Sequence, residues 1–111
     1  MEITYEDFRK VDIRVGTVLS LRKNDKARQP ALVLEVDFGR NIGIKTTSAK
    51  IIHYYNSDNL VGKQIIAVCN FPTKNIAGVV SEVLILGAIE TDGKVVLLHP
   101  SQTVENGLEV Y

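Results

Sequence analysis

Three side chains of this sequence have the chemistry of nucleophiles or acid–base groups: Cys69, His53 and His99. Neither histidine has a local partner suited to general acid–base work. Cys69 lies in the apolar run IIAVCNF, which is typical of a small core residue. No acidic or Cys/His cluster has metal-ligand spacing, and the glycines form no phosphate-binding loop. We therefore predict no catalytic residues, no metal and no cofactor.

Lysines and hydroxyl side chains are better placed for binding than for catalysis. They gather in three short segments, RKNDKAR at 22–28, KTTSAK at 45–50 and PTKNIAG at 72–78. The formal net charge is nevertheless zero: ten Lys and Arg against seven Asp and Glu (+3) up to residue 50, then three against six (−3). A strong nucleic-acid binder usually has a basic excess. Each segment taken alone is also compatible with an ordinary solvated loop.

Ser81 and Glu82 interrupt the apolar run NIAGVVSEVLILGA where its second half begins. A serine hydroxyl there can bond a phosphate, a backbone group or a neighbouring loop. A glutamate repels phosphate but can hold a nearby cationic side chain in place. Two interpretations stay open: the pair contacts a ligand, or it fastens the 72–78 loop to the rest of the fold.

Alternating or continuous apolar runs predict six strands, at residues 12–22, 31–39, 42–47, 64–71, 81–90 and 95–100. Helical spacing predicts short helices at 4–11 and 48–56. In the first helix, Thr4 would be the N-cap and Asp7 would complete a capping box, with Tyr5 and Phe8 facing inward.

The order of these elements is that of an OB-fold, a five-stranded Greek-key barrel. Period-two alternation places Ile13, Val15, Leu19 and Leu21 on one face of the first strand, and Gly16 marks a bend that curls the sheet. We predict one all-β domain over residues 1–111, with an N-terminal helix, a helix between strands three and four, and a C-terminal extension. We expect no membrane insertion, because no apolar run approaches the ~20 residues of a span.

The terminal additions predict an interface between two copies of the chain. Val95, Val96, Leu97 and Leu98 are consecutive apolar residues, so both faces of this short strand require burial. The barrel can cover one face, and a second subunit is the simplest cover for the other, with Phe8 of the first helix in the same interface. The alternative is that the strand folds back over the end of its own barrel.

Several segments resemble a known family. VDIRVGTV, LVGKQIIAVCNF and IAGVVSEVLILGA are similar to signature segments of the tRNA-binding domain family, whose members are OB-fold modules. KARQPALVLEVDFG, IGIKTTSAKI, NFPTKNIAGVVSEVLILGA and the tail VVLLHPSQTVENG resemble its CsaA branch. The resemblance covers essentially the whole chain. It implies a homodimeric chaperone that binds unfolded or precursor polypeptides for export, whereas the wider family implies tRNA binding.

The chain departs from the Ser-x-Gly-Met pattern of the tRNA-binding relatives, because Val83 and Leu84 follow Ser81 and Glu82. This departure and the zero net charge favour the chaperone over the alternative of a tRNA-binding protein. The start MEITYEDF is no secretory signal, so we expect a cytoplasmic location. The expected polypeptide-binding residues are Phe71, Pro72, Ile76, Arg28, Pro30 and Lys74. The expected residues of an RNA-binding face are Lys45, Ser48, Lys50, Asn70, Lys74 and Ser81.

Overall fold

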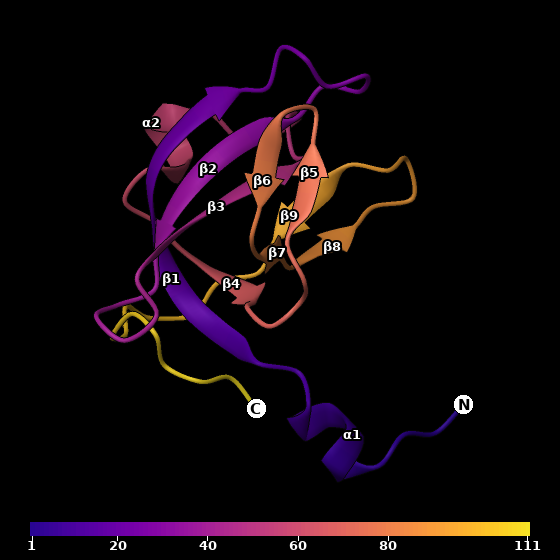
Figure 1. Cartoon of the computed structure of the whole chain (residues 1–111), viewed down its shortest axis with the longest axis vertical. Coiled ribbons are helices and arrows are strands. Elements are labelled where there is room, and N and C mark those ends of the chain that lie inside the picture. The colour runs from indigo at the N-terminus through magenta and orange to yellow at the C-terminus, as the bar shows by residue number, and fades with distance from the viewer.

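The main strands form one curled antiparallel sheet that closes nearly into a barrel (Figure 1). A computed structural model describes all 111 residues. The sheet has the order β3-β2-β1-β4-β7, and two ribbons pair β5 with β6 and β8 with β9. The predicted OB-fold, with short added helices, is confirmed. The elements are α1 (Tyr5–Arg9), β1 (Ile13–Lys23), β2 (Leu32–Asp37), β3 (Ile44–Ala49), α2 (Ser57–Leu60), β4 (Gln64–Val68), β5 (Lys74–Ile76), β6 (Val79–Ser81), β7 (Leu84–Ile85), β8 (Gly87–Ile89) and β9 (Val95–Leu97).

Strand β1 serves both halves of the barrel because it bends. Its first half pairs with β4 and its second half with β2. Gly16 allows the close approach at the bend, since a Cβ there would lie 2.6 Å from Val36 Cγ1. Val18, on the same face as Gly16, is fully buried in the barrel core, whereas Ile13 and Val15 belong to a separate apolar cluster. Leu19 is an extra residue in the pairing with β2, so Leu21 turns to the barrel core and Leu19 stays 43% exposed. The prediction that grouped Leu21 with Ile13 is wrong for this reason.

The barrel core is built around β2 and its continuation. Leu32, Leu34, Val36 and Phe38 alternate along this segment and are all buried, as the period-two pattern predicts. Thr47 of β3 is the one polar residue among the most deeply buried side chains. Its hydroxyl must therefore find partners inside the barrel wall.

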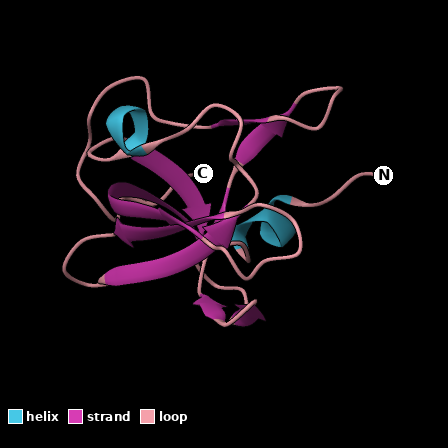
Figure 2. Cartoon of the chain, turned by 90° about the horizontal axis from the view of Figure 1, so that it is seen from above, coloured by secondary structure: helices cyan, strands magenta, loops and turns pink.

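The helix predicted at residues 48–56 is wrong in position. Ser48 and Ala49 belong to β3 and pair with β2, and only the four-residue helix α2, at 57–60, joins β3 to β4. This helix begins where Asn56 caps it: the side chain of Asn56 accepts from Asn59 N, and the side chain of Asn59 accepts from Asn56 N. Figure 2 shows α2 as a single short turn beside the strands.

The single fifth strand predicted at 81–90 is divided into β6, β7 and β8. The loop before it is also a strand, because Ala77 (φ 50°) and Gly78 (φ 86°) make the two-residue turn that joins β5 to β6. Leu86 separates β7 from β8, and its N–H donates to Ile66 O whereas its carbonyl accepts from Leu98 N. The chain therefore changes pairing partner at Leu86.

The C-terminal tail adds to the free edge of the first half of β1. The tail runs antiparallel to it, with Val15 N donating to Leu108 O at 3.1 Å and Val110 N to Ile13 O at 2.8 Å. Helix α1 projects from this end of the barrel (Figure 1), and its predicted Thr4–Asp7 capping box is confirmed. Phe8 is half-buried against a small apolar cluster outside the barrel core, formed by Ile13, Val15, Ile66 and Val68. Tyr5 is 64% exposed, so the prediction that it faces inward is wrong within one chain.

Candidate functional site

Ser81 closes the barrel between β6 and β3. It is only 8% exposed, and its hydroxyl oxygen accepts from Ser48 N at 3.1 Å. It also lies 3.1 Å from the hydroxyl of Thr47, which in turn donates to Val83 O at 2.8 Å. The buried Thr47 hydroxyl is thereby satisfied. The same bonds join β6 to β3, which is an outer strand of the five-stranded sheet.

Glu82 continues the same closure one residue further on. Its backbone N donates to Thr46 O at 2.8 Å, and its carboxylate accepts from Thr46 N at 3.0 Å. The other carboxylate oxygen lies 3.8 Å from Lys45 Nζ. The backbone and the carboxylate of Glu82 therefore both contact β3, and they fasten the β5–β6 ribbon to the barrel wall.

The basic loop between β1 and β2 is tied to the β5–β6 ribbon by one buried asparagine. Asn24 is 6% exposed, and its side-chain amide donates to Ile76 O at 3.1 Å. Its backbone N donates to Ala31 O at 2.9 Å, and its side-chain oxygen accepts from Lys26 N at 3.3 Å. Through Asn24 the β1–β2 loop and the β5–β6 ribbon therefore lie side by side. Asn24 was not among the predicted site residues, because its role rests on a bond to a residue 52 positions away.

A hollow of about 500 Å³ lies against this loop. Its apolar part comes from small side chains and from Ile52, which is 37% exposed. Cationic side chains and one carboxylate also line the hollow. The lining residues are Lys23, Asn24, Asp25, Ala27, Arg28, Pro30, Ala31 and Ile52. Of the expected polypeptide-binding residues, Arg28 and Pro30 line the hollow, whereas Ile52 was missed because it was assigned to a helix.

The remaining expected polypeptide-binding residues lie on the β5–β6 ribbon or before it. Ile76 is half-buried and carries the carbonyl that Asn24 bonds. Lys74 is exposed and pairs across the ribbon with Ser81. Phe71, 53% exposed, and Pro72 follow β4 and do not line the hollow.

The residues expected on an RNA-binding face are divided between free and occupied groups. Lys50 is exposed, but Lys45 is paired with Glu82. The hydroxyl of Ser48 is buried without a hydrogen-bond partner. Asn70 is occupied at both ends of its side chain, since its oxygen accepts from Asp12 N at 2.9 Å and its nitrogen donates to Lys10 O at 2.7 Å. It holds the start of β1 against the end of β4.

Strand β9 presents an apolar face that the single chain leaves open. Leu97 is 7% exposed and packs in the barrel core with the half-buried Val95, whereas Val96 and Leu98 are 44% and 45% exposed. Ile89, on the partner strand β8, is 75% exposed. The barrel therefore covers the face of β9 that carries Val95 and Leu97, as predicted from the sequence, and leaves the opposite face open.

The one cysteine of the chain, Cys69, is free and partly buried. Burial raises the pKa of the Cys69 thiol to about 11, so the thiol stays protonated near neutral pH and is a poor nucleophile. No group of three or more His, Cys, Asp and Glu side chains is placed to hold a metal ion. No helix combines the length and the apolar composition that crossing a membrane requires.

Comparison with known proteins gives full-length matches. The family model described as "putative tRNA binding domain" matches residues 13–109. The crystal structure of chaperone CsaA from Bacillus anthracis superimposes with a TM-score of 0.94 and 45% identity, covering 100% of both chains. That of the CsaA chaperone protein from Picrophilus torridus gives 0.91 and 48%, covering 99% of this chain and 100% of that one. The methionine–tRNA ligase of Bacteroides fragilis is 38% identical over 108 residues, which are 97% of this chain but only 16% of the ligase.

Proposed function

The chain belongs to the tRNA-binding domain family, and from this premise we propose that it is a chaperone of CsaA type that binds non-native or precursor polypeptides before export. Two of its full-length homologues, at 45% and 48% identity, are CsaA chaperones, and the chain spans only about 16% of the first curated ligases that it matches. It is accordingly a binding protein and not an enzyme. The observation that carries the proposal is the hollow beside the β1–β2 loop, whose lining combines apolar side chains with Lys23 and Arg28.

The hollow suits an extended polypeptide better than a phosphate backbone. Its volume of about 500 Å³ is within the range of ligand pockets, and Ile52 with Ala31 offers apolar contact to one client side chain. Lys23 and Arg28 can bond carbonyl or carboxylate groups of the client, while Asp25 prevents a purely cationic surface. A disordered client loses conformational entropy when it binds, so we expect modest affinity and broad sequence tolerance.

The functional unit in this proposal is a homodimer in the cytoplasm. The open face of β9, formed by Val96 and continued by Leu98, would be covered by the second copy. The projecting helix α1 supports the same arrangement, because Tyr5 is largely exposed and Phe8 is only half-buried in one chain. The protein would act without membrane insertion, on clients that have not yet crossed a membrane.

The second candidate function is recognition of a folded RNA such as tRNA, and the family match favours it. The contacts would come from Lys50 and Lys74, which lie next to β3 and on β5, whereas the Ser48 hydroxyl is buried and would first have to become accessible. Lys45 would have to leave Glu82, and Asn70 and Ser81 would have to give up their hydrogen bonds within the barrel. Because the net charge is zero and several of these groups are already bonded within the barrel, this candidate ranks second.

The test compares a charged residue placed in the lining of the hollow with the same residue placed elsewhere. In Ile52→Asp, loss of apolar contact should weaken binding of an unfolded peptide by at least about fivefold and reduce suppression of client aggregation. Ile44→Asp is the matched control, because Ile44 is 57% exposed on β3 and lies outside the hollow. Equal binding by both variants would contradict the proposal.

A salt titration separates the two candidate functions. Binding that buries apolar client surface should change little with salt, whereas phosphate binding must weaken steeply as salt rises. Steep salt dependence of tRNA binding, together with no suppression of client aggregation, would establish the RNA-binding alternative instead.

A further inference from the structure

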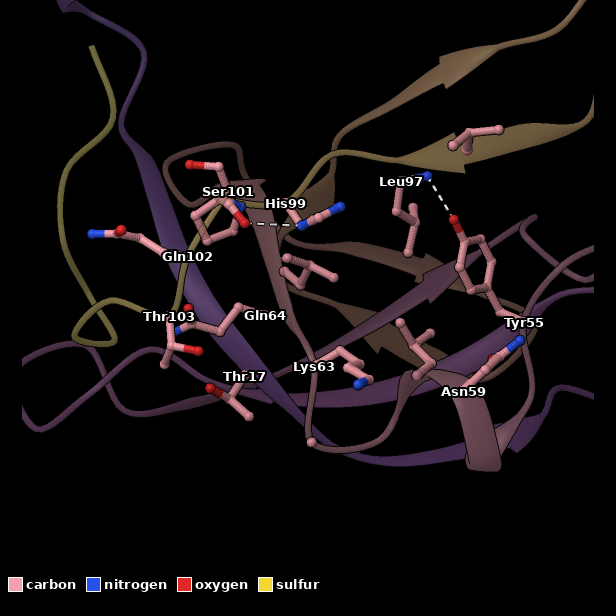
Figure 3. Close-up of a pocket in the computed structure, with 15 residues that line it drawn as sticks. Thr17, Tyr55, Asn59, Lys63, Gln64, Leu97, His99, Ser101, Gln102 and Thr103 are labelled. Carbon is pink, nitrogen blue, oxygen red and sulfur yellow. Dashed lines mark hydrogen bonds between the residues drawn. The ribbon is translucent and has the colours of Figure 1, made fainter.

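A second and larger cleft, of about 660 Å³, lies between α2, the start of β4 and the segment that follows β9 (Figure 3). It shares no lining residue with the hollow beside the β1–β2 loop. The segment from His99 to Thr103 forms one side, and Lys63 and Asn59 lie across from it. The cleft is therefore separate from the proposed client-binding hollow.

Part of its polar lining is fully occupied in holding the tail. The Gln64 side chain donates to Val104 O at 2.6 Å and accepts from Val104 N at 3.0 Å, and Thr17 donates to the side chain of Asn106 at 2.7 Å. The hydroxyl of Tyr55 accepts from Leu97 N at 2.8 Å. These bonds fix the shape of the cleft before any ligand enters.

Several other polar groups of the lining have no partner within the chain. Lys63 forms no ion pair, and neither the side chains nor the backbone N–H groups of Ser101, Gln102 and Thr103 make a hydrogen bond. These residues are exposed, so their donors are available to a ligand in the cleft. Ammonium, hydroxyl and amide donors of this kind suit an anionic group.

The charge of the lining points to the same class of ligand. The chain contains 13 Asp and Glu, yet none of them lines this cleft. Lys63 is the only permanently charged side chain in the lining, and His99 is the only other basic one. The His99 ring bonds the carbonyl of Pro100 through Nδ1 at 2.9 Å, so Nδ1 carries the hydrogen and Nε2 remains free. The local field therefore attracts negative charge.

We propose that this cleft binds a small phosphate monoester of mononucleotide size. Lys63 and the donors of residues 101–103 would hold the phosphate group, and the apolar residues Leu60 and Pro100 would contact the rest of the molecule. The volume of the cleft is within the range of small-molecule sites, which combine apolar walls with a few directed polar groups. This site is additional to the chaperone function proposed above and does not depend on it.

The test is a titration of the ¹⁵N-labelled full chain with AMP, followed by NMR. We expect saturable shifts of the amide signals of residues 101–103, with AMP binding more tightly than inorganic phosphate. Lys63→Gln should weaken AMP binding about threefold to fivefold, as expected for one solvent-accessible ion pair. Arg40→Gln is the matched control: it removes the same charge from an exposed turn outside the cleft, so AMP binding should not change.

Three outcomes would overturn the proposal. The first is the absence of saturable shifts at residues 101–103 with AMP. The second is equal weakening by Lys63→Gln and Arg40→Gln, which would show only a response to net charge. The third is that an RNA oligonucleotide shifts these amides while AMP does not, which would assign the cleft to a macromolecule. The amide spectrum of each variant without ligand shows directly that it is folded.

Discussion

Removal of one hydroxyl at Ser81 should destabilise the barrel more than its size suggests. In Ser81→Ala, Ser48 N loses the acceptor that it bonds at 3.1 Å, in a site where the serine is 8% exposed. The Thr47 hydroxyl keeps its bond to Val83 O, so one backbone donor is left unpaired. An unsatisfied buried donor costs about 1–3 kcal/mol, and we expect a loss of about 2 kcal/mol in the free energy of unfolding.

The assay is urea denaturation of Ser81→Ala beside a matched control. In thermal unfolding of a chain of 111 residues, the same loss of about 2 kcal/mol would lower the Tm by about 9 °C. In urea, the m value (the slope of the free energy of unfolding against urea concentration) should be unchanged, because the surface exposed on unfolding stays the same. Ser20→Ala is the control: its hydroxyl bonds Glu35 at an exposed position, so we expect less than about 0.5 kcal/mol.

A local measurement separates barrel closure from general damage. Hydrogen exchange of the Ser48 amide should accelerate in Ser81→Ala relative to amides in β1 and β2. If Ser81→Ala is as mild as Ser20→Ala and leaves exchange at Ser48 unchanged, Ser81 does not close the barrel and our account of this junction is refuted.

Three further predictions concern packing, titration and assembly. Gly16→Ala should lose about 1–3 kcal/mol in urea denaturation, since its Cβ would lie 2.6 Å from Val36 Cγ1; unchanged stability would show that the bend has free space. Because the pKa of Cys69 is raised to about 11, the thiol should react slowly with a thiol reagent at pH 8, and faster as pH rises toward 11 or when urea unfolds the chain; fast native reaction at pH 8 would contradict its burial. Leu98→Asp should give a monomer in light-scattering mass measurements while Val61→Asp, at another exposed apolar position, gives the mass of the wild type; a monomeric wild type would exclude the proposed dimer.

Elements with a regular period could be predicted from the sequence, whereas interruptions of the period could not. The alternation of Leu32, Leu34 and Val36 shows a half-buried strand directly, because every second side chain faces the core. The bulge after Val18 leaves no trace in the apolar pattern of β1. The exposure of Leu19 and the turn of Leu21 to the core therefore appear only when β1 is paired with β2.

The helix before β4 shows how local propensity is overridden by pairing. The apolar spacing in 48–56 imitates a helix, but Ser48 and Ala49 are taken by β2. The actual signal was the reciprocal cap of Asn56 and Asn59, three residues apart.

The candidate site depended in the same way on contacts between distant residues. The sequence identified the two loops but left the role of Ser81 and Glu82 open. Their roles follow from hydrogen bonds to β3, more than thirty residues away. Similarly, the importance of Asn24 rests on one bond to Ile76 O.

The most direct test of the proposed client site is an NMR titration of the ¹⁵N-labelled chain with an unfolded client peptide. We expect saturable shifts of the amides of Ala27, Arg28 and Ile52, and we expect Ile52→Asp to weaken them. Saturable shifts confined to residues 45–50, with no change at the β1–β2 loop and the same affinity in Ile52→Asp, would contradict the account.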